Sequence, residues 1–134
     1  MFKYNHLTKV YYRDVDQMGI VYYTRYLEYF EEARTELLNA LGLTISFIEE
    51  KGIQLPVIAS HCEYRKGAKL EDKLLIEASI LEIPKVKLNI NYNVLDQYSN
   101  KLLLTGYTRH AFIGKSGNPK RVPKFILDKI KIHF

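Results

Sequence analysis

The sequence has few of the residues that mark unusual environments. Its 134 residues include a single cysteine, Cys62, and no tryptophan. Because a lone cysteine cannot form an internal disulfide, a reducing compartment is the default. No stretch approaches the roughly 20 apolar residues of a membrane-spanning helix, and the first residues lack the apolar run of a signal peptide. We therefore expect a cytoplasmic protein with no integral membrane segment.

Several catalytic signatures are also missing. No Gly-x-Ser-x-Gly elbow occurs, which argues against a serine hydrolase of that type. Cys62 follows His61, but neighbouring residues of a strand point to opposite faces, so these two do not form a nucleophile–base pair. The four histidines show no metal-ligand spacing, and His110 is most simply a core or interface residue. We expect no metal.

The composition is that of one folded domain covering residues 1–134, with 47% hydrophobic and 26% charged residues. The net charge of +5 favours an anionic partner such as nucleic acid, acidic lipid or a phosphate-bearing ligand. An RNA-binding interpretation depends only on this charge and on eleven tyrosines, and no RNP-like aromatic motif supports it. We expect no nucleic-acid partner.

The longest helical pattern covers residues 24–41, and Gly42 fits a helix stop. Its apolar stripe comprises Tyr26, Leu27, Phe30, Ala33, Leu37, Leu38 and Leu41. Shorter helices are predicted over residues 45–51 and 123–131. Strands are predicted over residues 7–13, 53–64, 74–81, 86–94 and 102–113, where apolar and polar residues alternate or β-branched residues gather. One long helix followed by strands in series predicts an α+β domain with an antiparallel sheet packed on that helix.

The segment before the long helix groups Asp14, Asp16 and Gly19. Three interpretations are open. The two acids are caps of the turn before the helix; or Asp-x-Asp-x-x-Gly begins a calcium loop; or a carboxylate beside a helix N-terminus is half of an acyl-transfer site. The calcium loop fails, since its fifth and twelfth positions are Met18 and Arg25 instead of oxygen ligands.

The same segment, Asp14-Val15-Asp16-Gln17-Met18-Gly19-Ile20-Val21-Tyr22-Tyr23, followed by Ala33-Arg34-Thr35-Glu36, resembles the 4-hydroxybenzoyl-CoA thioesterase family. It is most similar to the branch of Tol-Pal-associated acyl-CoA thioesterases. The likeness extends to Tyr64, Ala68 and Asp72 and to the segment 117–123, with Gly67 where the family has proline. It implies the hotdog fold, in which an antiparallel sheet wraps one long central helix.

The resemblance also implies roles for single residues. It makes Asp16 the catalytic carboxylate, acting as nucleophile or general base, and gives the backbone N–H of Tyr23 the task of polarising the thioester carbonyl. The related branch often has histidine at position 23, so a role that needs an imidazole is in doubt here. Gly19 and Val21 would border the substrate. The hydratase branch of this fold needs a histidine five residues after the aspartate, where this chain has Val21.

An acyl-CoA substrate would need an acyl pocket and cations for its phosphates. We expect Tyr26 and Tyr64 at the acyl group. The basic residues expected at the CoA end are Arg65, Lys66, Lys85 and Lys87. CoA is then part of the substrate, and no separate cofactor is expected. The alternatives are an acyl-carrier-protein thioesterase and a non-catalytic acyl-CoA-binding module. Members of the family pair their sheets edge to edge, so a homodimer or homotetramer is expected.

Overall fold

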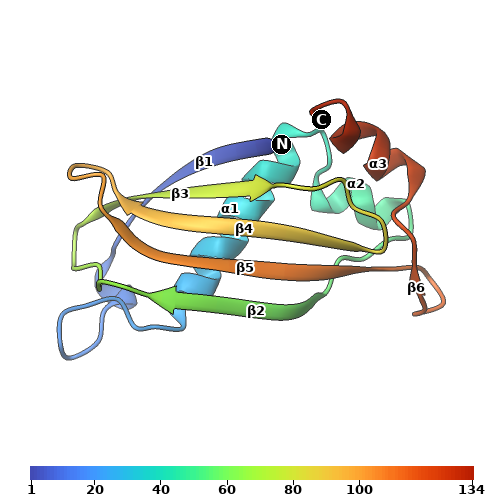
Figure 1. Ribbon diagram of the computed structural model, residues 1–134. Helices are drawn as coiled ribbons and strands as arrows, with labels where there is room; N and C mark the ends of the chain where they lie inside the picture. The colour runs from blue at the N-terminus through green and yellow to red at the C-terminus, as the bar shows by residue number, and fades with distance from the viewer.

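The computed structural model describes residues 1–134 and forms one sheet with one long helix against it (Figure 1). In chain order the elements are β1 (Phe2–Lys9), a 3₁₀ turn (Tyr12–Asp14), α1 (Arg25–Ala40), α2 (Ile45–Glu50), β2 (Val57–Tyr64), β3 (Lys73–Ile80), β4 (Lys87–Asp96), β5 (Leu102–Ile113), β6 (Pro119–Lys120) and α3 (Lys124–Lys131). None of these helices has the length and hydropathy needed to cross a membrane.

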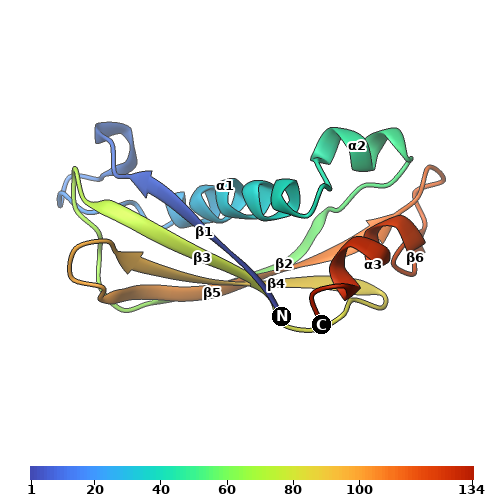
Figure 2. The ribbon, with the colours of Figure 1, turned by 90° about the horizontal axis from the view of Figure 1, so that it is seen from above.

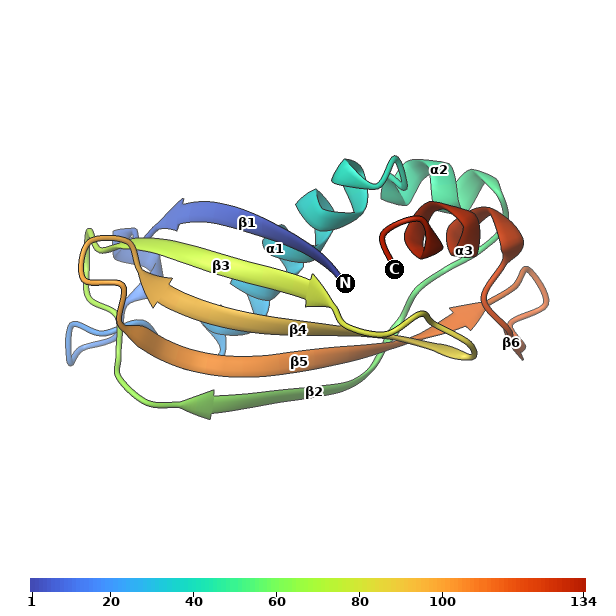
Figure 3. The ribbon, with the colours of Figure 1, turned by 45° about the horizontal axis from the view of Figure 1, so that its top comes forward.

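The sheet is antiparallel throughout, with the strand order β1-β3-β4-β5-β2 and β6 paired to β5. Alternate residues of β3 and β4 are buried, as expected for strands with one face on a core. The sheet curves around α1 (Figure 2), while α2 and α3 lie together at one end (Figure 3). The loop before α1 lies at the other end of the sheet (Figure 1). The predicted α+β class is confirmed.

The apolar face of α1 enters the core as predicted, with two corrections. Phe30, Ala33 and Leu37 are fully buried. Leu27 is 39% exposed and so lies outside the stripe, while Tyr29, which the periodicity analysis left out, is 3% exposed. The buried face is therefore rotated from the predicted one toward Tyr29.

The closest approach of α1 to the sheet is made over a glycine. Phe30 stacks on Tyr92 of β4 at a centroid distance of 4.1 Å. A Cβ on Gly106 of β5 would stand 2.8 Å from the Phe30 ring and 2.4 Å from the backbone oxygen of His61. The absence of a side chain at Gly106 therefore lets the helix lie directly on the sheet.

Several predicted boundaries were wrong. The first strand covers Phe2–Lys9 rather than residues 7–13, because Tyr12–Asp14 turns into a 3₁₀ helix. The strand predicted over residues 53–64 begins at Val57, since the chain before Pro56 makes only an isolated bridge to β5. The short strand β6 was missed, because nothing in its two residues signals pairing.

Candidate functional site

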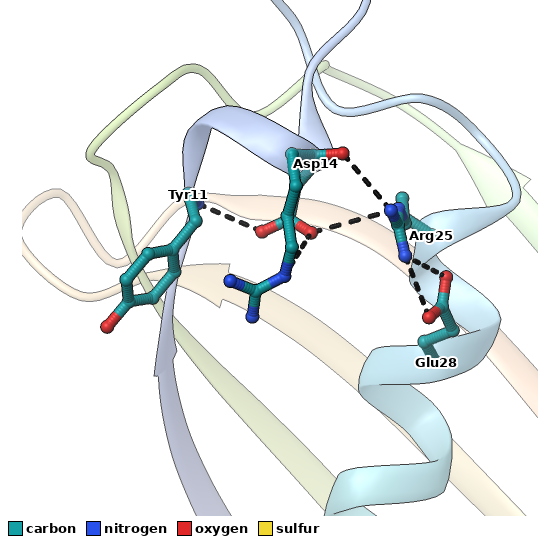
Figure 4. A network of polar contacts seen from close by, with 5 residues as sticks. Tyr11, Asp14, Arg25 and Glu28 are labelled. Atoms are coloured by element: carbon teal, nitrogen blue, oxygen red, sulfur yellow. Dashed lines mark hydrogen bonds and ion pairs between the residues drawn. The ribbon is translucent and has the colours of Figure 1, made fainter.

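The candidate site lies in the loop between the 3₁₀ turn and α1, which begins at Asp14. The side chain of Asp14 is buried, and Figure 4 shows its polar contacts. Its Oδ2 accepts the N–H of Tyr11 at 2.9 Å. Its Oδ1 lies 3.8 Å from Nε of Arg25 and 3.9 Å from Nε of Arg13. Arg25 also binds both carboxylate oxygens of Glu28, at 2.8 and 2.7 Å. Asp14 thus ties the 3₁₀ turn to the first turn of α1, a structural task.

The hydroxyl of Tyr29 is buried beside Asp14 without a hydrogen-bond partner. Burial raises the pKa of Tyr29, and the negative charge of Asp14 raises it further. The phenol therefore stays neutral, and Asp14 faces one neutral group and two guanidinium groups. The two guanidinium groups and the Tyr11 N–H hold the Asp14 side chain in place.

Asp16 stands two residues later in a different environment. Its Oδ1 accepts the N–H of Met18 at 2.8 Å, and its carbonyl accepts the N–H of Gly19 at 3.0 Å. Gly19 has a φ of +78°, a conformation that favours glycine. This turn leaves Asp16 Oδ2 without a partner in the chain, on a half-buried side chain. Neither acid caps α1, whose N-cap is Thr24. The capping interpretation holds for the turn before the helix, because the Asp14 side chain accepts the N–H of Tyr11 and the Asp16 side chain that of Met18, but it does not hold for α1 itself.

The loop is fastened to the segment that follows β2. The N–H of Val21 donates to the carbonyl of Ala68 at 2.9 Å, and Ile20 bridges Lys69. The N–H of Ala68 in turn donates to the hydroxyl of Tyr26 at 3.2 Å. Val21 and Tyr26 are therefore core residues that hold the loop, and Tyr26 is only 2% exposed.

The start of α1 offers free backbone donors next to Asp16. The N–H groups of Tyr23 and Thr24 donate no hydrogen bond within the chain, and Thr24 provides no side-chain cap. Such N–H groups, with the helix dipole behind them, favour an anion. The pKa of exposed Tyr22 is raised, first by its contact with Tyr23 and also by the charge of Asp16. The Asp16 carboxylate therefore lies near the Tyr22 side chain, which precedes the N-cap Thr24 by two residues.

Aromatic side chains surround this helix start. The ring of Tyr64, at the end of β2, meets the Tyr23 ring edge-on at 6.4 Å and the Tyr26 ring at 5.8 Å. The Tyr64 hydroxyl donates to the carbonyl of Tyr23 at 3.1 Å. Tyr23 and Tyr64 are 57% and 50% exposed, so both are available to a ligand or a partner chain.

The structure divides the predicted basic residues between the two ends of the sheet. Lys66 lines a hollow of about 200 Å³ with Lys69 and Lys101 and with the carboxylates of Asp72 and Asp96. The hollow lies at the end of the sheet that holds the β4–β5 hairpin and the loop before α1 (Figure 1). The N–H groups of Arg65 and Lys66 both donate to the carbonyl of Leu103. The sequence analysis missed Lys69 and Lys101. No sequence motif marks Lys101 as a site residue, because only the β4–β5 hairpin brings it close to Lys66.

Lys85 and Lys87 lie elsewhere. They line a hollow of about 410 Å³ together with Arg109, at the opposite end of the sheet. This hollow is on the face turned away from α1, since Arg109 alternates along β5 with the buried residues Thr108 and His110. Within one chain, Lys85 and Lys87 are not brought together with Asp16.

Comparison with known proteins agrees with this geometry. The sequence profile of the thioesterase-like superfamily matches residues 10–130. The chain belongs to the thioesterase-like superfamily. This thioesterase is 27% identical over 123 residues to a putative esterase of Aquifex aeolicus, covering 92% of the chain and 94% of that protein. It is 41% identical over 76 residues to the acyl-CoA thioesterase YbgC of Haemophilus influenzae, covering 56% of each.

Solved structures support the fold. A 1,4-dihydroxy-2-naphthoyl-CoA thioesterase from Synechocystis superimposes with a TM-score of 0.88 at 23% identity, covering 96% of each chain. The implied hotdog fold is therefore confirmed, and the protein is a thioester hydrolase.

Proposed function

We propose that this thioesterase hydrolyses an acyl-CoA to the free acid and CoA, with Asp16 as the reacting carboxylate. The observation that carries the proposal is that one short loop holds both a carboxylate oxygen, Asp16 Oδ2, and a backbone donor, the N–H of Tyr23, that have no partner in the chain. A carboxylate and an oxyanion-binding donor are the two groups that acyl transfer from a thioester needs. The names of the relatives support CoA thioesters as the substrate class.

Two routes are consistent with this arrangement. In the first, Asp16 Oδ2 attacks the thioester carbon, the C–S bond breaks, and CoA leaves as a thiolate that then takes a proton. Water hydrolyses the resulting anhydride. In the second, Asp16 takes a proton from a water whose oxygen adds to the carbonyl, and the same C–S bond breaks. In both, the Tyr23 N–H stabilises the oxyanion as it develops.

Asp16→Asn tests the proposal against Asp14→Asn. An asparagine at position 16 keeps an oxygen for the Met18 N–H but cannot act as nucleophile or base. We expect kcat to fall by on the order of 10²–10⁴ while acyl-CoA still binds. Asp14→Asn should instead lower the melting temperature, because it removes the anion between Arg13 and Arg25. Normal turnover by Asp16→Asn would reject the assignment and favour a binding module.

A single turnover in ¹⁸O-labelled water separates the two routes. An Asp16 anhydride gains ¹⁸O in the Asp16 side chain when water attacks the Asp16 carbonyl carbon rather than the acyl carbon, and mass spectrometry of the site peptide detects it. Label in Asp16 therefore establishes the anhydride route, because the general-base route places all of the ¹⁸O in the product acid. Offering the same acyl group on CoA and on acyl carrier protein identifies the carrier: a kcat/KM that favours the protein-bound form would replace acyl-CoA as the substrate.

A further inference from the structure

Two carbonyl groups next to the site are held in fixed directions. The carbonyl of Tyr22 accepts the N–H of Arg25 at 2.8 Å, a bond within the first turn of the helix. The carbonyl of Tyr23 accepts the hydroxyl of Tyr64 at 3.1 Å, a bond that joins residues 41 positions apart. The first constraint is local, while the second comes from strand β2.

The Tyr23 carbonyl has no other donor. In a regular helix it would accept the N–H of Leu27, four residues on. Here the N–H of Leu27 instead donates to the carbonyl of Thr24 at 3.2 Å. The Tyr64 hydroxyl is therefore the one hydrogen-bond donor that holds the Tyr23 carbonyl.

A peptide group is planar and trans, so its C=O and N–H point in opposite directions. Fixing the Tyr22 carbonyl thus fixes the N–H of Tyr23. Fixing the Tyr23 carbonyl fixes the N–H of Thr24, which also lacks an acceptor in the chain. The free donors of Tyr23 and Thr24 are thus each oriented through the carbonyl of their own peptide group.

We infer that Tyr64 is a positioning residue: its hydroxyl orients the Tyr23–Thr24 peptide so that the Thr24 N–H joins that of Tyr23 as a donor to the oxyanion. The inference rests on the proposed function. Tyr64 acts through the peptide group and needs no contact with the reacting atoms.

The environment of Tyr64 suits a fixed donor. Its ring packs against the rings of Tyr23 and Tyr26, which limits its rotation. Burial, with a smaller contribution from Cys62, raises the pKa of Tyr64 to about 12. The hydroxyl therefore keeps its proton over the pH range in which a thioesterase is assayed, and the orientation it imposes is independent of pH in that range.

Tyr64→Phe tests the inference, because it keeps the ring and removes only the hydroxyl. Deleting one oxyanion donor costs about 10²–10³ in kcat, and a donor left in place but free to turn should cost less. We expect kcat to fall about tenfold, with KM within about twofold of wild type and an unchanged melting temperature and pH profile. The amide resonance of Thr24 should shift in the ligand-free protein. Tyr107→Phe, on the opposite face of the sheet, is the matched control and should leave all five readouts unchanged.

Each other result contradicts the inference. An unchanged kcat would show that the hydroxyl orients nothing of catalytic value. A raised KM with normal kcat would make Tyr64 a substrate contact, and a lowered melting temperature with proportionate loss of kcat would make it a structural residue. Failure of the proposed function looks different: Asp16→Asn would stay active, whatever Tyr64→Phe does.

Discussion

At the residue scale, two aspartates separated by one residue have opposite environments. Asp14 is 4% exposed and lies near two guanidinium groups, whereas Asp16 keeps one carboxylate oxygen free. A buried and paired carboxylate contributes to stability and has little freedom to react. The two acids differ because Asp14 belongs to the 3₁₀ turn, which buries its side chain, whereas Asp16 lies beyond that turn and is half-buried.

His110 is a second residue whose state the fold decides. Its Nδ1 lies 3.1 Å from the carbonyl of Leu55 and so must donate to it. Its Nε2, 2.9 Å from Thr108 Oγ1, then accepts the threonine hydroxyl, which itself accepts from Tyr92 at 2.7 Å. In this arrangement the imidazole is neutral, and protonation of Nε2 would reverse the hydrogen bonds of both hydroxyl groups. Burial lowers the pKa of His110, and the nearby charge of Arg34 on α1 lowers it further.

Acid should therefore destabilise the protein through His110. Between the lowered folded pKa and the unfolded value of about 6.5, the unfolded chain binds a proton that the folded chain does not. Stability then falls as the pH falls below about 6.5, by at most about 1.4 kcal/mol per pH unit. Melting temperatures measured from pH 7.5 to 5 should fall less steeply for His110→Gln. His61→Gln, which alters an exposed histidine, should keep the wild-type slope. Equal slopes for wild type and His110→Gln would contradict this account.

At the element scale, β2 is the edge strand that borders the proposed site. The strand order places β1 and β2 at the edges of the sheet. Three large side chains of β2 are about half exposed: Val57 is 45% exposed, Ile58 48% and Tyr64 50%. Exposed apolar side chains on an edge strand favour pairing with another chain. Tyr64 also belongs to the proposed site, so whatever covers β2 also borders the site.

We predict that two chains pair their β2 strands, with a homodimer as the minimum unit and a tetramer as a further possibility. Ile58→Lys places two like charges in that interface, and it should give monomers with reduced activity at micromolar concentration. Leu7→Lys introduces the same charge at the other edge strand, where Leu7 is 60% exposed, and should leave the dimer intact. Sedimentation measures both variants. A fully active wild-type monomer would refute the prediction.

At the scale of the whole molecule, positive charge is unevenly placed. Residues 114–134 contain six Lys or Arg and one acid, so this segment carries the whole net charge of +5. It forms β6 and α3, at the end of the sheet away from Asp16 (Figure 1). The N–H of Val122 donates to the carbonyl of Lys85 at 2.7 Å, which brings Lys85 to the same end. At the end that holds Asp16, the cations include Arg13 and Arg25, which lie beside Asp14, and the three lysines of the smaller hollow.

CoA should therefore depend on Lys66 and Lys101 more than on Lys85 and Lys87. Phosphate contacts with lysine side chains weaken as salt rises. Free CoA should inhibit wild type less at high salt, and dephospho-CoA should inhibit less than CoA. The double variant Lys66→Ala/Lys101→Ala should raise the inhibition constant and flatten its salt dependence. Lys85→Ala/Lys87→Ala is the charge-matched control. A larger effect from the control would mean that a partner chain supplies the phosphate contacts.

The elements that depend on local pattern could be predicted from the sequence. The spacing of apolar residues predicted α1, and alternation predicted β3, β4 and β5 within one or two residues. The motif around Asp16 and Gly19 indicated the segment where the structure places a free carboxylate and a glycine of positive φ. Each of these signals is contained in a few neighbouring residues, so no knowledge of the fold was needed to find them.

The tertiary structure decided everything that depends on pairs far apart in the chain. It placed Tyr64 under the carbonyl of Tyr23 and brought Lys101 to the end that holds Asp16. It also separated Lys85 and Lys87 from Asp16, although the sequence analysis had grouped them in one site. The sequence by itself determined which segments are helix, strand and reactive loop, because hydrophobic burial has a period along the chain. Strand order and the face of the sheet on which a residue lies produce no periodic pattern in the sequence. They depend on which distant segments pack together.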